Sequence, residues 1–331
     1  MYKNKYFCIV YLICMFFFQK TRSQDAEFSQ FLNNPVYLNP AMYGINGGPR
    51  FIANYRNQWP ELQRAFETYS FSYDQHFDKI SGGIGVQVLT DNQAAGIVKT
   101  NLFSGGYNHL FRVSDNTGIR VGMNAALIQK RLDWTRLLFT DQFDQSTALP
   151  VNSVTTEQLP DFSSKSVVDI GAGFIAYSKS IYLGIAAKHI NQPNESFYNS
   201  YKSTLPVRFL TNFGAQIRTK RGKSTYISPN IMFLSQAKFK QINGQLLLNT
   251  SPVLLGMGYR HTFNNSDALI FIAGIQKGIF RTVYSYDNTY SNLRGNTGGA
   301  HELSLIINFN DGKKAAAKRT LKNSIDCPDL L

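Results

Sequence analysis

The chain has 331 residues, of which 43% are hydrophobic, 14% aromatic and 17% charged, and its formal net charge is +13. After the N-terminus no apolar run reaches the ~18 residues that a membrane-spanning helix needs, which excludes a helical membrane protein. Many aromatic residues, few charges and no long apolar run are together typical of a transmembrane β-barrel.

Residues 1–23 have the pattern of a secretory signal peptide. Two lysines precede the apolar stretch Tyr6–Phe18, and Ser23 is a small residue at a suitable cleavage position. We therefore expect the mature chain to begin at Gln24 or Asp25. A short membrane anchor is the alternative, but the apolar stretch is too short to span a bilayer.

Removal of this peptide changes the cysteine content and the charge of the chain. Cys327 is then the single cysteine, so no internal disulfide can form. Four basic residues and no acidic ones leave with the peptide, which lowers the net charge from +13 to +9. The remaining basic excess indicates anionic neighbours, such as lipopolysaccharide phosphates or acidic proteins. Alternatively, the cations line the lumen and the short turns.

Residues 24–49 show no strand pattern. The pairs Asn34-Pro35 and Asn39-Pro40 push each asparagine out of helical geometry, and three glycines follow. We expect a structured N-terminal plug segment that precedes the barrel and folds into its lumen.

From Arg50 to Phe309 apolar and polar residues alternate with a period of two, in segments separated by turn residues. The alternation is clearest in 69–74, 83–88 and 119–127. Apolar side chains would then face lipid, and small or polar ones the lumen. A soluble β-sandwich alternates similarly, but the signal peptide, strand lengths and aromatic content favour a barrel.

Further strands are expected to start near Arg50, Val98, Ser166, Ile181, Leu205, Ser224, Phe239, Pro252, Ala268, Arg281 and His301. The sequence thus predicts an all-β fold, a transmembrane antiparallel β-barrel of about 14 strands over residues 50–309. An even number of strands predicts periplasmic termini.

The expected connections differ in length at the two ends of the barrel. The long ones follow odd-numbered strands, at about Asp133–Ser164, Asn191–Thr204 and Asp287–Ala300. The short ones follow even-numbered strands, at 178–180, 220–223 and 249–251. Long loops outside and short turns inside are the usual arrangement in outer-membrane barrels.

Residues 310–331 form a basic C-terminal tail, which this arrangement places in the periplasm. Residues 313–322 are basic and contain good helix formers. A solvated tail and a partner-binding tail both fit this composition.

The sequence offers little catalytic chemistry, and no catalytic, cofactor or metal site is expected. None of the five histidines has a metal-ligand spacing to another histidine or cysteine. A barrel lipase would need a serine beside a histidine. Tyr259-Arg260-His261 followed by Asn264, Asn265 and Ser266 supplies the residue types, but in an expected loop, where a polar turn explains them better.

An ordered series of short stretches extends over nearly all of the mature chain. They are Phe28-Ser29-Gln30-Phe31, Asn34-Pro35, Leu38-Asn39-Pro40-Ala41, Gly44, Tyr55-Arg56-Asn57-Gln58-Trp59-Pro60, Gly184, His189, Asn191-Gln192-Pro193, Leu205-Pro206, Ile227-Ser228-Pro229, Gly256-Met257-Gly258-Tyr259-Arg260, Tyr284-Ser285-Tyr286-Asp287 and His301-Glu302. Together they resemble the type IX secretion system membrane protein family, PorP/SprF. The resemblance does not extend to the tail with Cys327.

This resemblance implies a non-enzymatic outer-membrane component of a machine that exports proteins with a C-terminal sorting domain and in many species serves gliding motility. The implied partners are the secreted cargo, which the barrel helps to export or anchor at the cell surface, and the periplasmic ring lipoproteins. Outer-membrane lipid and lipopolysaccharide are expected neighbours, whereas nucleic acid is not.

The longest loop carries a candidate partner-binding surface. Trp134, Leu137, Leu138, Phe139 and Phe143 supply apolar anchors of the kind that dominate interface energy. Alternatively, this loop folds over the mouth of the barrel as a lid.

The alternative function is that of a porin or hydrophobic-solute channel, because a barrel of about 14 strands can leave an open lumen. Conductance would distinguish the two functions: an open pore favours the channel, and a silent barrel favours the secretion role.

Overall fold

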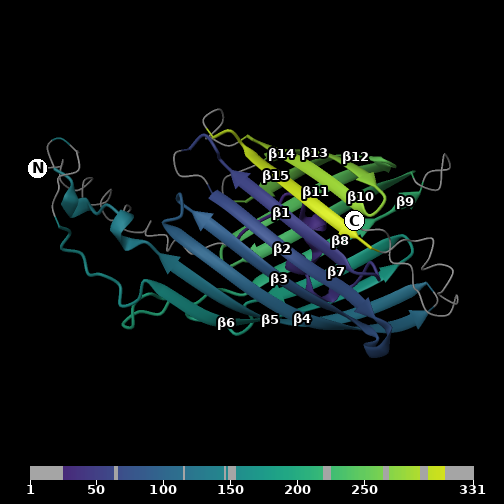
Figure 1. The fold of residues 1–331 in the computed structure, drawn as a ribbon, viewed down its shortest axis with the longest axis horizontal. Helices are drawn as coiled ribbons and strands as arrows, with labels where there is room; N and C mark the ends of the chain where they lie inside the picture. Colours follow the sequence, from purple (N-terminus) through teal and green to yellow (C-terminus); the bar gives the residue numbers. More distant parts are fainter. Residues whose placement is uncertain are drawn as a thin grey trace, which may run out of the picture.

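The computed structural model describes residues 25–62, 66–114, 116–144, 147, 154–218, 225–263, 268–290 and 297–309. They form one antiparallel sheet that closes on itself around a segment of short helices (Figure 1). The expected signal peptide and C-terminal tail lie outside the described residues. No described helix is long and apolar enough to cross a bilayer.

The strands follow one another around the barrel in chain order. They are β1 (Arg50–Gln58), β2 (Phe66–Phe77), β3 (Gly82–Gln93), β4 (Val98–Ser114), β5 (Thr117–Leu132), β6 (Ser164–Ser178), β7 (Ile181–Lys188), β8 (Arg208–Ala215), β9 (Ile217–Arg218), β10 (Thr225–Gln236), β11 (Phe239–Thr250), β12 (Val253–Thr262), β13 (Ala268–Lys277), β14 (Phe280–Thr289) and β15 (Ala300–Asn308). The short β9 continues β8, both pair with β10, and β15 pairs with β1. The predicted 14-stranded antiparallel barrel is therefore confirmed.

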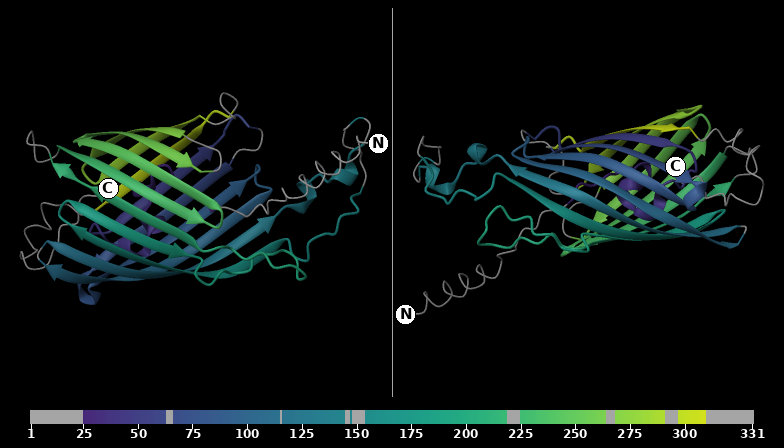
Figure 2. Two further views of the ribbon diagram at one scale, coloured as in Figure 1. Left: turned by 180° about the vertical axis from the view of Figure 1, so that it is seen from behind. Right: turned by 60° about the horizontal axis from the view of Figure 1, so that its bottom comes forward.

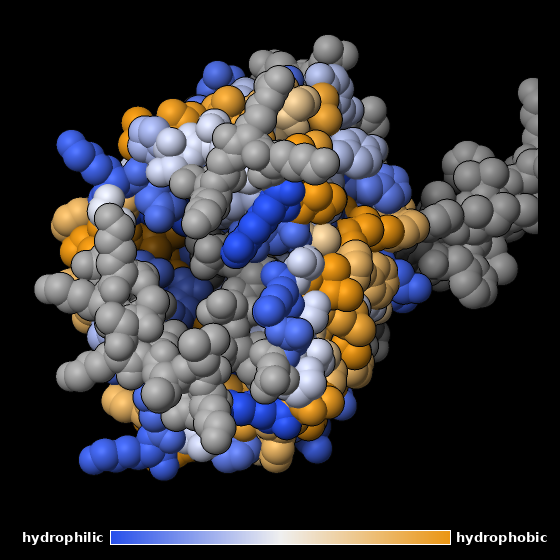
Figure 3. Space-filling model, turned by 90° about the vertical axis from the view of Figure 1, so that its right-hand side faces the viewer, coloured by the Kyte–Doolittle hydropathy of each residue, from blue (hydrophilic) through white to orange (hydrophobic). Residues whose placement is uncertain are grey.

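The alternation of side chains is the physical basis of this fold. In β2, Tyr69 and Phe71 point outward and are 45% and 52% exposed, whereas Ser70 and Ser72 point inward and are 5% and 1% exposed. An end-on view shows hydrophobic side chains on the outer wall (Figure 3). An apolar outer wall around polar inward side chains suits a bilayer as solvent.

The longest connections lie at one end of the barrel, the long-loop end, although β3–β4 and β10–β11 are joined there by short turns. Leu132 of β5 is joined to Ser164 of β6 over the long end, whereas two residues join β6 to β7 at the short end. One expected long connection was placed wrongly. β14 continues to Thr289, so Asp287 lies within a strand and not in a loop. A single carboxylate at the end of a strand pattern suggests a turn. The Asp287 side chain instead faces the lumen, where it is buried and forms ion pairs with Arg56 and Arg260.

Residues 25–49 lie inside the barrel and are here called the plug. They contain η1 (Phe31–Asn33), α2 (Pro35–Leu38) and η2 (Pro40–Met42), separated by Asn34 and Asn39 in non-helical geometry, as the two Asn-Pro pairs predict. Their apolar side chains form a core with inward residues of β6, β7, β8 and β10. The lumen is thus filled by the chain's own N-terminal residues.

Glycines in the wall let the plug approach the strands closely. A Cβ atom on Gly83 would lie 1.9 Å from the carbonyl oxygen of Tyr43, and one on Gly173 would lie 1.9 Å from Asn39 Oδ1. Both distances are far below van der Waals contact, so a larger residue at either position would require the plug to move. The lumen beside Gly173 is thus packed by the plug.

The two ends of the described chain lie at opposite ends of the barrel. Arg50 begins β1 and Phe309 follows β15 at the short-turn end, where Phe309 N donates to Pro49 O at 3.0 Å. Asp25 instead pairs with His189 and Arg208 at the long-loop end. An even number of strands places the start of the first strand, Arg50, and the end of the last strand, near Phe309, at the same end of the barrel. It does not determine where the plug begins. Which side of the membrane each of these two ends faces stays a prediction.

Candidate functional site

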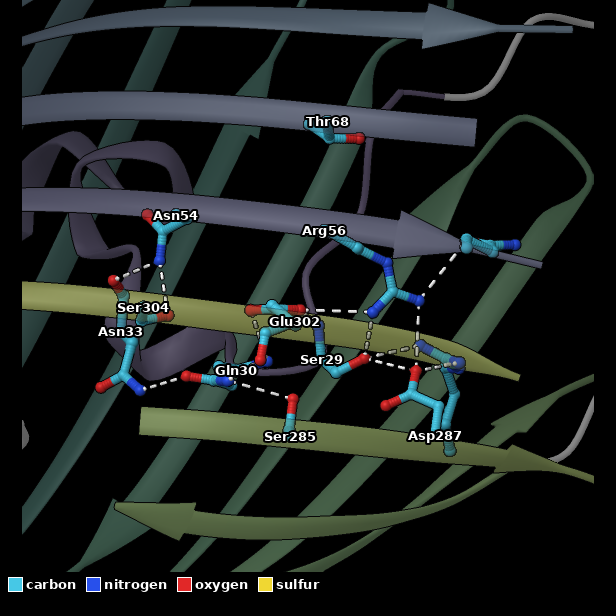
Figure 4. Close-up of polar contacts among 12 residues, drawn as sticks. Ser29, Gln30, Asn33, Asn54, Arg56, Thr68, Ser285, Asp287, Glu302 and Ser304 are labelled. Atoms are coloured by element: carbon cyan, nitrogen blue, oxygen red, sulfur yellow. Dashed lines mark hydrogen bonds and ion pairs between the residues drawn. The ribbon is translucent and has the colours of Figure 1, made fainter. Parts of the chain in front are cut away.

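The plug is held near its N-terminal end by contacts among five residues, which we call the anchor cluster: Ser29, Arg56, Arg260, Asp287 and Glu302. All but Arg260 are labelled in Figure 4. Ser29 belongs to the plug, and the charged residues come from β1, β12, β14 and β15. Two guanidinium groups and two carboxylates converge on one serine in the interior of the barrel. Their formal charges balance.

Ser29 is contacted from several sides. Its Oγ donates to Asp287 Oδ2 at 2.5 Å and accepts from Arg56 at 2.5 Å. The Glu302 carboxylate accepts from the backbone N–H of Ser29 at 2.7 Å and of Gln30 at 3.1 Å. Gln30 Nε2 donates to the carbonyl oxygen of Glu302 at 3.0 Å. The wall thus provides partners for the backbone and the side chains of two consecutive plug residues.

Ion pairs connect the charged members of the anchor cluster. Arg56 lies 3.1 Å from Asp287 and 3.2 Å from Glu302, and Arg260 lies 2.7 Å from Asp287. The side chains of Arg56, Asp287 and Glu302 are at most 3% exposed. Removing one partner of a buried pair leaves an uncompensated charge, which typically costs about 3–5 kcal/mol.

A second cluster, which we call the rim cluster, fixes the first described residue at the long-loop end. Asp25 lies 2.7 Å from His189 Nε2 and 3.2 Å from Arg208, while His189 Nδ1 lies 3.0 Å from Asp169. Burial alone would lower the pKa of His189, but the two carboxylates raise that pKa to about 9. Burial alone would raise the pKa of Asp25, but His189 and Arg208 hold it well below its usual range. Both groups are therefore charged at neutral pH.

An open cavity of about 410 Å³ lies between the plug and the wall at the long-loop end. Asp25 and Glu27 of the plug line it, together with Arg56 and Arg260. Its wall also carries amide and aromatic side chains, namely Gln58, Gln93, Gln241, Trp59, Phe66 and Phe239. The described plug residues therefore leave a recess beside the wall at this end.

The five predicted partner-binding residues lie on the long β5–β6 connection, within or beside η4 (Trp134–Arg136) and η5 (Thr140–Gln142). The rings of Trp134 and Phe139 pack together with centroids 4.9 Å apart. Leu138 and Phe143 are 56% and 37% exposed. The described part of this connection extends away from the barrel and not across its opening (Figures 1 and 2).

The residues considered for a lipase lie in a different position from the one expected. Tyr259, Arg260 and His261 belong to β12 and not to a loop. The His261 ring lies between Tyr259 and Phe263, with centroids 6.5 Å and 5.0 Å away. Arg260 points inward to the anchor cluster. Residues 264–266 lie outside the described part of the chain.

Sequence reasoning missed both clusters. A signal was present, because the alternation places the charged residues Arg56, Asp287 and Glu302 at lumen-facing positions of their strands. A charge in such a position needs a buried partner. The identity of that partner, Ser29 of the plug, could not be read from strand periodicity.

Comparison with known proteins places the chain in a family. Among solved structures it is similar to the KdgM porin (7% identity, TM-score 0.35, covering 78% of this chain and 99% of that chain). It is also similar to BamA from Haemophilus ducreyi lacking POTRA domains 1–3 (10%, 0.40, 79% and 70%) and to a mutant Rh. blastica porin (8%, 0.34, 79% and 99%). No curated protein matches it. The family model "Type IX secretion system membrane protein PorP/SprF" matches residues 20–307, and the chain therefore belongs to this family.

Proposed function

We propose that the protein is a non-enzymatic outer-membrane component of the type IX secretion and gliding system that supports export or surface anchoring of proteins with a C-terminal sorting domain. Family membership supports a role in this system. The observation that carries the proposal is the filled lumen. Because the plug occupies the interior, the surfaces left for partners are the long loops and the recess beside them. Fixed contacts at both clusters argue against the alternative of an open porin.

We further propose that the long-loop end faces outward and docks the secreted cargo. The apolar residues between Leu137 and Phe143 supply exposed anchors on a loop that extends beyond the barrel. Such anchors carry most of the energy in protein interfaces. For these loops to face outward, the barrel has to be inserted in the outer membrane after the signal peptide is cleaved near Ser23.

Deleting Leu137–Phe143 should abolish surface retention of the cargo, because its apolar anchors are lost while the barrel wall is untouched. Cargo is measured by antibody labelling of intact cells, and barrel folding by heat-modifiable migration in detergent gels. A Leu159→Ser variant is the matched control, since Leu159 is also exposed on the same connection. If cells with the folded deletion variant keep the same amount of cargo on their surface as wild-type cells, docking at this loop is refuted.

The N-terminal end of the mature chain should be reachable from outside the cell. A peptide tag inserted before Asp25 would emerge beside the rim cluster at the long-loop end, whereas a tag after Phe309 would emerge at the short-turn end. We expect antibody to label the first tag on intact cells, and the second after permeabilisation alone. The reverse pattern would invert the proposed orientation.

At the short-turn end, we propose contacts with the periplasmic ring lipoproteins through basic residues. The candidates are Lys220, Arg221, Lys223 and the segment 313–322, all outside the described residues. Trimming 313–322 should weaken co-purification of the ring lipoproteins with the barrel, because opposite charges guide such encounters. Equal recovery from wild-type and trimmed strains would remove the tail from the interface.

A further inference from the structure

The outward-facing side chains of β3, β4, β5 and β6 change from apolar to polar toward the long-loop end. Strand register aligns Val88, Phe103, Leu127 and Val168 in one outward-facing row, each at least 44% exposed. Two residues further along every strand, the row consists of Thr90, Asn101, Gln129 and Ser166. The next row consists of Asn92, Lys99, Arg131 and Ser164. The apolar band thus ends in two polar rows.

The first polar row lies at the height of the membrane headgroup layer, and the second row lies at or just beyond the outer edge of that layer. Each step of two residues advances about 5 Å along the membrane normal for a strand tilted by ~40°. The polar rows therefore lie roughly 5 and 10 Å beyond the last apolar row. Headgroups occupy about 5–8 Å on each side of the hydrocarbon core.

The first polar row is already ordered. Thr90 Oγ1 donates to Asn101 Oδ1 at 3.0 Å, and Asn101 Nδ2 donates to Gln129 Oε1 at 3.3 Å. A hydrogen-bonded chain across three strands holds its amide and hydroxyl groups in place. Groups that both donate and accept hydrogen bonds suit a hydroxyl-rich ligand.

The second polar row places two like charges face to face. Lys99 and Arg131 are directly opposite across β4 and β5, and both are exposed. Like charges in this position repel one another and destabilise a sheet. In the part of the chain that the structure describes, no ion pair joins either residue to a carboxylate. The next outward residue, Asp133, accepts from Thr135 at 2.7 Å, and Glu195 pairs with the neighbouring Lys130 at 3.2 Å.

We propose that Lys99 and Arg131 bind a phosphate on the headgroup of an outer-leaflet glycolipid, and that the Thr90–Asn101–Gln129 row contacts the sugar beneath it. An anion between the two cations removes their repulsion, with Arg131 offering a planar donor pair and Lys99 a point charge. The site would hold the lipid against the wall on the side that bears the long β5–β6 connection. This inference depends on the outward orientation of the long-loop end and not on the secretion role.

The test is binding of lipid A to the purified full-length protein in detergent, measured by native mass spectrometry. A variant combining Lys99→Gln and Arg131→Gln should bind about tenfold more weakly or worse, since a charge-assisted hydrogen bond is worth roughly 1.4 kcal/mol or more. The matched control combines Lys240→Gln and Lys277→Gln. These lysines are also exposed, but they face Ser235 and Phe280 and not a second cation.

Two further probes define the ligand. Dephosphorylated lipid A should bind the wild type as weakly as lipid A binds the double variant, and inorganic phosphate alone should give no binding at the same concentrations. Equal lipid A binding by the two double variants, each shown to be folded by heat-modifiable migration, would overturn the site. Tight binding of dephosphorylated lipid or of free phosphate would overturn the assigned chemistry.

Discussion

Removal of residues 26–45 should turn an electrically silent barrel into a conducting one. The deleted residues fill the lumen and leave the closed wall intact, because β1 pairs with β15 over nine residues and needs no plug residue for its ladder. A barrel of about 14 strands without its filling has space for ions. The effect is expected to be all-or-none at the level of single insertions in a planar bilayer.

The matched variants for this experiment are two glycine substitutions. Gly83→Ala should displace the plug, because its Cβ would lie 1.9 Å from Tyr43 O, and should raise the frequency of brief openings. Gly105→Ala should remain silent, because its Cβ would meet the nearest atom, Val86 Cγ1, at 3.7 Å. A deletion variant that folds but stays closed would show that another element seals the barrel. Steady conductance by the wild type would favour the porin alternative.

Asp287→Asn should produce the largest loss of stability among single substitutions. Asp287 Oδ2 is shared by Arg56 at 3.1 Å, Arg260 at 2.7 Å and Ser29 at 2.5 Å. The change therefore leaves the buried Arg56 and the partly buried Arg260 with Glu302 as their remaining carboxylate in the anchor cluster. Removing one partner of a buried ion pair costs about 3–5 kcal/mol. The free energy of unfolding is measured by urea titration of the refolded protein in lipid vesicles.

The control for this substitution is Asp78→Asn. Asp78 has a side chain that is 82% exposed and lies 3.4 Å from His76, so the neutral change should leave the urea midpoint nearly unaltered. If Asp287→Asn shifted the midpoint as little as Asp78→Asn, the anchor cluster would not stabilise the folded barrel. Conductance of the same variant shows whether the plug has also left the lumen.

The strands could be predicted because their signal is local. The period of two and the turn residues locate the strands within a few residues. One of the larger deviations is β8, which begins at Arg208 and not at the expected Leu205. Pro206 precedes it and cannot donate to a strand ladder. The extension of β14 past Asp287 escaped prediction because a buried carboxylate and a turn carboxylate look alike in sequence.

The clusters could not be predicted because their partners are far apart in the chain. Ser29 and Glu302 are separated by 273 positions, and Arg56 and Asp287 by 231. Their meeting depends on closure of the barrel and on the path of the plug within it, which no local pattern encodes. The position of Asp25 at the long-loop end has the same origin, since it depends on how far the plug extends through the lumen.

The register of the first and last strands gives the anchor cluster a role in assembly. Arg56 of β1 and Glu302 of β15 are direct partners across the closing seam, and the Ser29 backbone binds Glu302 while its side chain binds Arg56. Before the last strand is synthesised and paired, this binding place does not exist. Ser29 can therefore make both of these contacts only when β1 and β15 are paired. Ser29 thus connects the first and last strands of the barrel and stabilises their pairing.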